Sequence, residues 1–281
     1  MDSYKITAEQ IAAYGCWLRR EERAHSTVEK YLRDLRGFIR WLAGRPATKE
    51  LAHIWKEHLL EENYAPATVN SKLAVINGFF HFLGWDGLRV KPLRIQRQVF
   101  RDQSRELGKA DYDRLVETAR NLGRERLALL LETICGTGIR VSEVYYITVE
   151  SAQRGQAEVR LKGKVRVILL APKLCRKLLK YARKNKIASG EIFVTRSGKS
   201  MGRQQIWAEM KSLCEQAGVE QSKVFPHNLR HLFATCFYRV CRDIVQLADV
   251  LGHSSIETTR IYLLTTGAEH AKHLERLGLV S

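Results

Sequence analysis

The chain has 281 residues, of which 45% are hydrophobic, enough for one large or two ordinary domains with packed cores. Its formal net charge of +17 is the balance expected of a nucleic-acid-binding protein. No apolar run approaches membrane-spanning length, and the N-terminal MDSYKITAEQ lacks a secretion signal. We therefore expect a bacterial cytoplasmic protein that associates with the nucleoid and has no membrane partner.

The positive charge is concentrated after residue 86. Residues 1–86 hold 12 basic and 11 acidic side chains, whereas residues 87–281 hold 35 and 19. The six cysteines are scattered and none has the spacing of a zinc site. We expect reduced thiols, no metal and no cofactor.

The first 85 residues predict a small helical domain. Apolar residues recur at helical spacing in four segments, with Ser26 as a candidate cap and Pro66 near a first turn. The expected helices cover residues 6–22, 26–44, 48–62 and 66–84.

Residues 86–106 are predicted to form an extended basic linker between two domains. The segment lacks periodicity and contains Pro92. Its basic residues are Arg89, Lys91, Arg94, Arg97, Arg101 and Arg105. A charge run is often only a solvated surface, but a position between two domains favours contact of these residues with a nucleic-acid backbone.

From Leu107 onward the pattern predicts a mixed α/β, mainly helical domain. Two short strands, QAEVRLK and KVRVILL, flank a tight turn at residues 162–164, and another short strand is expected at 191–194. The expected helices cover residues 109–121, 123–135, 140–146, 172–184, 203–217, 227–240, 242–251, 254–264 and 268–277. The fold class is therefore mostly α with a small antiparallel sheet.

Two cationic segments are candidates for binding an anion. In CGTGIRVSE, a glycine-containing turn before a helix presents backbone amides together with Arg140. The alternative is a structural arginine paired with Glu143. Lys162, with Lys164 and Arg166 on the same ribbon, could lie along a DNA groove, although an isolated lysine on a turn is usually only solvated.

A histidine and an arginine share one face in HNLRH. His227 and Arg230 are three residues apart at the start of a helix, so both side chains can address one anion at its positive end. His231 is expected to point elsewhere and to be structural.

A histidine and a tyrosine follow in LGHSSIETTRIY. Gly252 permits a sharp turn between two helices, and Ser254 or Ser255 can cap the second. His253 then lies at the junction, and Tyr262 follows about two and a half helical turns later.

Together these segments resemble the tyrosine recombinases, also called the phage integrase family. The family order is an arginine in GTGIRVSE, a lysine in a KGK hairpin, HNLRH, LGH and then a tyrosine. STVEKYLRDLRGFIRWL and APATVNSKLAVINGFFHFL resemble its four-helix, SAM-like core-binding domain, and residues 105–115 resemble the opening of its catalytic domain. The resemblance covers nearly the whole chain. It implies the two-domain Xer-type architecture, with core binding at 1–85, a linker at 86–106 and catalysis at 107–281.

The resemblance also implies a role for each site residue. Arg140 and Arg230 would hold the scissile phosphate, Lys162 would be the general acid, His227 would act as acid or base, His253 would hydrogen-bond the phosphate, Glu143 would orient its neighbours and Tyr262 would be the nucleophile. The hairpin lacks the glycine that often precedes the family lysine. This departure leaves Lys164 as the alternative general acid.

The implied activity is site-specific DNA recombination through a 3′-phosphotyrosine, without metal or ATP. It further implies a tetramer on double-stranded DNA, accessory DNA-bending or directionality proteins, and integration or excision of a mobile element. The tail helix at about 267–278 would dock on a neighbouring subunit, with packing on its own domain as the alternative. Two alternatives remain open: a monomeric type IB topoisomerase, and a non-catalytic DNA-binding protein on the same fold.

Overall fold

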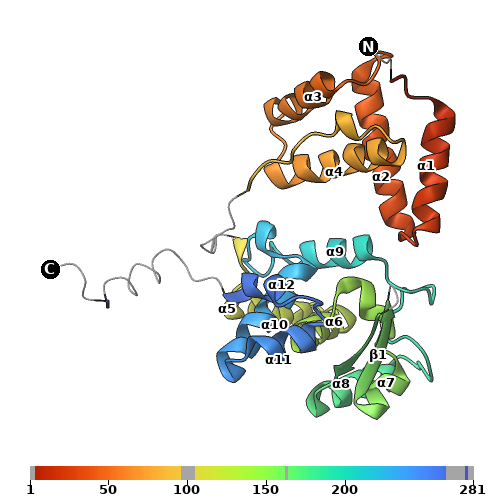
Figure 1. Ribbon diagram of the computed structural model, residues 1–281. Coiled ribbons are helices and arrows are strands. Elements are labelled where there is room, and N and C mark those ends of the chain that lie inside the picture. Colours follow the sequence, from red (N-terminus) through yellow and green to blue (C-terminus); the bar gives the residue numbers. More distant parts are fainter. Residues whose placement is uncertain (1–3, 96–104, 162–163, 264–275, 278–281) are drawn as a thin grey trace. The chain divides into compact units, whose positions relative to one another are not determined.

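The computed structural model of the chain describes residues 4–95, 105–161, 164–263 and 276–277. Lys162, Arg97, Arg101 and nearly all of the predicted tail helix lie outside the described residues. The chain divides into two compact units, residues 1–97 and 98–281, each with its own hydrophobic core (Figure 1). The sequence-based boundaries at residues 85 and 107 stay predictions.

The first unit is a four-helix domain, as predicted. Its elements are α1 (Ala8–Arg20), α2 (His25–Leu42), α3 (Lys49–Glu61), α4 (Pro66–Phe82) and the short 3-10 helix η1 (Asp86–Leu88). Pro66 occupies the first turn of α4, as expected. Ser26 is not the cap of α2, because that helix begins one residue earlier with Ala24 at the cap position. Packing of Leu35 and Phe38, which are fully buried, anchors α2 instead.

The first residues of the predicted linker pack on this unit instead of extending away from it. Asn77 of α4 exchanges two hydrogen bonds with the backbone of Val90, at 2.8 and 3.0 Å. Asn70 does the same with Leu93, at 2.9 and 2.7 Å. Two asparagine side chains therefore bind this backbone as a neighbouring strand would, which the charge pattern of the segment did not indicate.

The second unit is mainly helical and contains one antiparallel pair of strands. Its elements are α5 (Lys109–Asn121), α6 (Glu125–Thr137), η3 (Val141–Tyr146), α7 (Val149–Arg154), β1 (Gln156–Leu161), β2 (Lys164–Leu169), α8 (Pro172–Lys184), α9 (Arg203–Lys211), η4 (Gln221–Lys223), α10 (Pro226–Cys241), α11 (Ile244–Leu251), α12 (Ile256–Arg260) and η5 (Ile261–Leu263). In the sheet, Gln156 pairs with Leu169 and Leu161 with Lys164. Figure 1 shows α7 and α8 beside this hairpin.

Several segments of this unit differ from the sequence prediction. The helix expected at 203–217 ends at Lys211, and the one expected at 140–146 is a 3-10 helix. Helix α7 was not predicted, because its six residues are too few to show a periodicity; Thr148 and Ser151 cap it reciprocally. Residues 191–194 do not form a strand: Glu191 and Val194 make only isolated bridges, with Thr148 and Ser200. This apolar run is core sequence, since Ile192 and Phe193 are fully buried.

Helices α6 and α10 of this unit lie in close contact near the end of α6. Helix α6 ends at Gly138, whose φ of +63° is the left-handed conformation that favours glycine. A Cβ there would lie only 2.4 Å from the ring of Phe233 on α10. The absence of a side chain therefore lets α10 lie directly against the segment that leads to Arg140.

Within the part of the chain that the structure describes, no helix combines the length and apolar character needed to cross a bilayer. All six cysteines, each of them a described residue, carry free thiols.

Candidate active site

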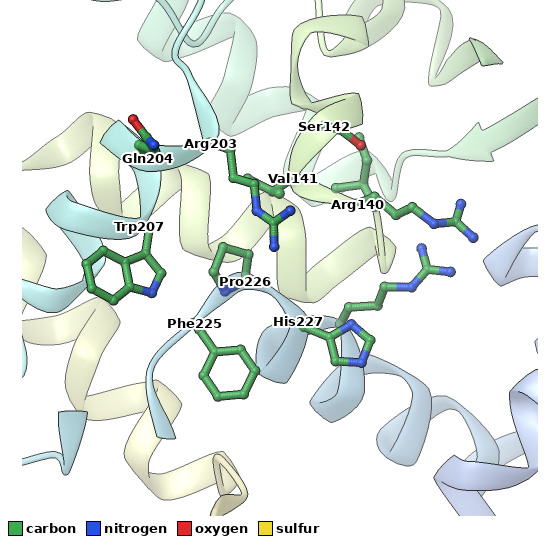
Figure 2. A pocket seen from close by; sticks show the side chains of 11 residues that line it. Arg140, Val141, Ser142, Arg203, Gln204, Trp207, Phe225, Pro226 and His227 are labelled. Carbon is green, nitrogen blue, oxygen red and sulfur yellow. The ribbon is translucent and has the colours of Figure 1, made fainter. Parts of the chain in front are cut away.

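One pocket of the second unit collects side chains from separate segments. It measures about 650 Å³ and is lined by Arg140 from the turn before η3 and by His227 and Arg230 from α10. Figure 2 shows Arg140 and His227 at one end of this pocket and Trp207 of α9 at the other. The pocket therefore unites residues that lie almost a hundred positions apart in the chain.

Arg230 is buried and bound to backbone. Its side chain donates to the carbonyl oxygens of Gly138 at 2.5 Å and Leu251 at 2.7 Å. Burial, followed by the charge of the nearby Arg140, lowers the pKa of Arg230 to about 10. The guanidinium stays protonated at neutral pH. Among the described residues it forms no ion pair with a carboxylate, so its charge is available to an incoming anion.

Arg140 is paired but not buried. Its Nη1 lies 3.0 Å from Oε1 of Glu143, and its backbone N–H donates to Oε2 of the same residue at 2.9 Å. The side chain of Arg140 is nevertheless 39% exposed. The two interpretations of this arginine are therefore compatible: Glu143 holds the guanidinium while its remaining donors face the pocket.

Glu143 is the buried carboxylate of the site. Burial raises the pKa of its carboxyl group, but the Arg140 backbone amide and the Arg166 guanidinium together outweigh burial and lower it below the ordinary value. Glu143 is therefore ionised at neutral pH. Its contacts with Arg140 agree with the orienting role that the resemblance implied.

His253 accepts a hydrogen bond from a catalytic candidate. Its Nε2 lies 3.0 Å from Arg230 Nη2, and its Nδ1 lies 2.8 Å from the Thr259 hydroxyl. A guanidinium only donates, so Nε2 must be unprotonated and Nδ1 carries the proton. Burial, followed by the charges of Arg230 and Arg140, lowers the pKa of His253 to about 4.

His227 is also neutral at neutral pH. Burial lowers its pKa below the ordinary 6.5, and the charges of Arg230 and Arg140 lower it further. A neutral imidazole beside two arginines can accept a proton, which suits a general base.

Tyr262 is buried in the described structure. It is 3% exposed and packs with Ala234 of α10 and with Leu247 and Leu251 of α11. Its ring stacks on His253, with centroids 6.1 Å apart. A hydrogen bond to Tyr262 is among the influences on the Arg230 pKa. The tyrosine thus lies beside the cation that would hold its target.

His231 lies nearer to the site than the sequence interpretation placed it. Its ring meets the ring of Tyr262 edge-on, with centroids 4.9 Å apart. The signal was present in the sequence, since His227 and His231 are four residues apart and therefore share a helix face. Arg203 and Trp207 of α9, which also line the pocket, were not singled out from the sequence.

The predicted DNA contacts have different surroundings. Arg89, Lys91 and Arg94 are exposed, and Arg89 pairs with Asp86 at 3.0 Å. Arg166, predicted to lie on an open ribbon, is instead 13% exposed and bound to Glu143. Arg97, Arg101 and Lys162 lie outside the described residues, and so does the side chain of Lys164. The general-acid assignment between the two lysines therefore stays a prediction.

This part of the structure thus brings together a half-exposed arginine, two neutral histidines, a tyrosine and a buried arginine that has no carboxylate partner among the described residues. Comparison with known proteins identifies the family of the chain. Residues 105–268 match the phage integrase family, and residues 11–87 match the phage integrase N-terminal SAM-like domain. The chain therefore belongs to the phage integrase family, the tyrosine recombinases, which are DNA strand transferases.

Several recombinases resemble the chain over most of its length. Tyrosine recombinase XerC of Roseiflexus castenholzii is 32% identical, covering 94% of this chain and 92% of its own. XerD of Xanthomonas campestris pv. campestris is 28% identical, with 90% and 87% covered. The fold is shared with lambda integrase, solved as a tetramer on a Holliday junction, at a TM-score of 0.73 and 16% identity, with 92% and 77% covered.

Proposed function

We propose that the protein is a site-specific recombinase that cuts and rejoins DNA through a 3′-phosphotyrosine intermediate, without metal or ATP. The observation that carries this proposal is the position of Tyr262 beside Arg230, a buried cation whose charge no described carboxylate offsets. Arg140 supplies a second guanidinium at the same pocket.

The two arginines would bind the non-bridging oxygens of the scissile phosphate. A guanidinium presents paired donors that match phosphate oxygens, and negative charge on those oxygens grows in the pentacoordinate transition state. The backbone carbonyls that hold Arg230 also hold its orientation before DNA arrives. These fixed charges take the part that metal ions play in other phosphoryl-transfer enzymes.

The covalent step balances without a co-reactant. The Tyr262 oxygen forms a bond to phosphorus while the bond from phosphorus to the 5′-oxygen breaks. His227 takes the phenolic proton, and Lys162, with Lys164 as the alternative, protonates the departing 5′-oxygen. The phosphotyrosine ester retains the energy of the broken bond, so a 5′-hydroxyl from a second strand can attack it and reseal the DNA.

Two local rearrangements would accompany DNA binding. Tyr262 is buried, so its ring must shift towards the pocket to meet a phosphate. His253 Nε2 accepts from Arg230 and can donate to a phosphate oxygen only after it gains a proton or exchanges tautomer. A phosphate anion in the pocket favours that protonation, because it offsets the two guanidinium charges.

We further propose that the protein acts as a tetramer on double-stranded DNA, and that the tail at about 267–278 docks on a neighbouring subunit. The tetrameric lambda integrase, which has the same fold, supports the assembly. The biological role proposed is integration or excision of a mobile element in the cell's nucleoid, with accessory DNA-bending proteins. The similarity to the Xer tyrosine recombinases supports a role in DNA recombination.

A nicked suicide substrate tests the chemistry. Because release of a short 5′ fragment prevents religation, the wild-type protein should accumulate as a covalent complex, and EDTA should not reduce its yield. Tyr262→Phe should form none, since its side chain lacks the attacking oxygen. Covalent capture that survives Tyr262→Phe, or that needs magnesium, would contradict the mechanism.

A second assay separates recombination from the alternatives. The target site is first mapped by covalent trapping on genomic DNA beside the gene. Two copies of this site are then placed on a supercoiled plasmid, and the protein should exchange strands between them. Relaxation of plasmids without exchange would favour a topoisomerase. Binding without covalent capture would favour a non-catalytic DNA-binding protein.

A further inference from the structure

Arg166 of β2 lies where three segments of the site meet. Its Nη2 pairs with the Glu143 carboxylate, and its Nη1 donates to the Val250 carbonyl oxygen at 3.0 Å. Its Nε is buried and has no hydrogen-bond partner among the described residues. The guanidinium therefore joins the hairpin strand, the start of η3 and the end of α11.

The stem of Arg166 also fills the space beneath the turn that carries His253. Gly252 has a φ of +62°, and a Cβ on it would lie 2.4 Å from Cδ and 3.1 Å from Nε of Arg166. The Arg166 side chain therefore contacts the backbone of this turn at Val250 and at Gly252. A change in the Arg166 side chain would be transmitted to the backbone that leads into His253.

The partners of Arg166 are hydrogen-bonded in turn to the candidate catalytic arginines, or lie next to a residue that is. Glu143, held by Arg166, is the residue that pairs with Arg140. The Leu251 carbonyl, next to the one that Arg166 binds, accepts from Arg230. One side chain thus bears on both arginines of the pocket and on the turn of His253, although it does not line the pocket itself.

We propose that Arg166 is a positioning residue that aligns Arg140 through Glu143, and Arg230 and His253 through the α11–α12 turn. It does not contact the DNA phosphate. A phosphate held in the pocket would meet the side chains that line it, which include Arg140 and Arg230 but not Arg166. This inference rests on the proposed function, because it assigns Arg166 to the geometry of that reaction.

The test measures binding and cleavage separately in Arg166→Met and Arg166→Lys. Affinity for the uncleaved site is measured in a Tyr262→Phe background over a range of salt concentrations. Cleavage is measured with the suicide substrate at saturating protein. We expect unchanged affinity and salt dependence, with cleavage slowed about a hundredfold by Arg166→Met, the loss typical of a small misplacement of reacting groups. The lysine variant keeps a charge but cannot reach both partners, so its loss should be smaller.

Arg126 of α6 offers a matched control. It too joins a backbone carbonyl and a carboxylate, Val194 at 2.6 Å and Glu209 at 2.8 Å, but it lies outside the catalytic pocket. Arg126→Met should lower the melting temperature as Arg166→Met does, without changing saturated cleavage. If the Met variant of Arg166 does not fold, Gly252→Ala displaces the Arg166 stem while retaining its charge and should also slow cleavage at unchanged affinity.

Three outcomes are decisive. First, Arg166→Met could lose affinity, with the salt slope reduced by about one, while its cleavage at saturating protein stays normal. That result would show a phosphate contact and overturn the inference. Equal cleavage by wild-type protein and both Arg166 variants would also overturn it. Absence of covalent complex with the wild-type protein would instead reject the proposed function.

Discussion

Each unit of the protein buries a carboxylate among cations, and the two clusters have different outcomes. Asp34 in the first unit meets Lys30 at 2.8 Å and Lys72 at 3.8 Å. Lys30 also donates to Ser71, so the cluster is satisfied locally. Glu143 in the second unit likewise holds Arg140 and Arg166, but beside them lies Arg230, which binds carbonyl oxygens and His253 and pairs with no carboxylate among the described residues.

The comparison shows how a buried carboxylate can serve two purposes. In the first cluster the charges stabilise a helical domain. In the second, the carboxylate orients one arginine, while a further arginine, bound only to neutral groups, leaves excess positive charge at a pocket. The second cluster therefore differs from the first in having one cation, Arg230, that pairs with no carboxylate among the described residues. That excess positive charge is what suits the second cluster to binding an anion.

Removal of Arg230 should produce the largest difference in cleavage rate between variants of the two clusters. Arg230→Met is expected to slow covalent-complex formation about a thousandfold, the scale of losing a major transition-state contact. Asp34→Asn should leave the rate unchanged. The suicide-substrate assay at saturating protein measures both, and comparable losses in the two variants would mean that the second cluster is not specialised for an anion.

Removal of each carboxylate tests the stabilising role. Glu143→Gln leaves Arg166 without its ion pair and should reduce the free energy of unfolding of the second unit by about 3 kcal/mol. Asp34→Asn, whose lysines are more exposed, should cost the first unit about 1 kcal/mol. Chemical denaturation followed separately in each unit measures these values, and a larger loss for Asp34→Asn would reverse the interpretation.

The Glu143 carboxyl also predicts a pH dependence of stability. Its folded-state pKa is lowered, so the stabilisation is present above the unfolded-state pKa of about 4.3 and is lost as the pH falls through the folded-state value. Wild-type protein should therefore lose more stability on acidification than Glu143→Gln. Denaturation at neutral and acidic pH gives the two slopes, and equal slopes would contradict the ionised state assigned to Glu143.

A smaller effect concerns the neutral histidines of the second cluster. Because the His227 pKa lies below 6.5, the base is already unprotonated at neutral pH. The rate of covalent-complex formation at limiting protein should stay level down to pH 6.5 and fall only below it. The same profile in His227→Gln should be lower and should lack this acidic decline. A decline that begins above pH 6.5 would show that the arginines do not depress this pKa.

The smallest effect should come from the exposed cations that follow the first unit. Lys91→Ala and Arg94→Ala are each expected to reduce the slope of log affinity against log salt by about one, if each binds one phosphate. Lys184→Ala is the control, because Lys184 pairs with Glu125 at 2.7 Å. Binding titrations at several salt concentrations measure the slopes, and an equal change in the control would mean that the effect is one of total charge.

The sequence by itself determined the four helices of the first domain, the hairpin, and the order and identity of the site residues. Regular apolar spacing predicts helices whatever they pack against, and residues three or four apart on a helix must share a face, as His227 and Arg230 do. The match to the phage integrase family confirmed the class of protein that this order implied.

Only the tertiary structure decided how those residues are connected. Arg166 is 23 residues from Glu143 and 84 from Val250, and no local periodicity reports a contact at such separations. The burial of Tyr262 and its contact with His231 likewise depend on the packing of α10 against α11 and η5. Spacing along the chain predicts which face of its own element a side chain occupies, whereas the partner on that face is set by how distant elements pack.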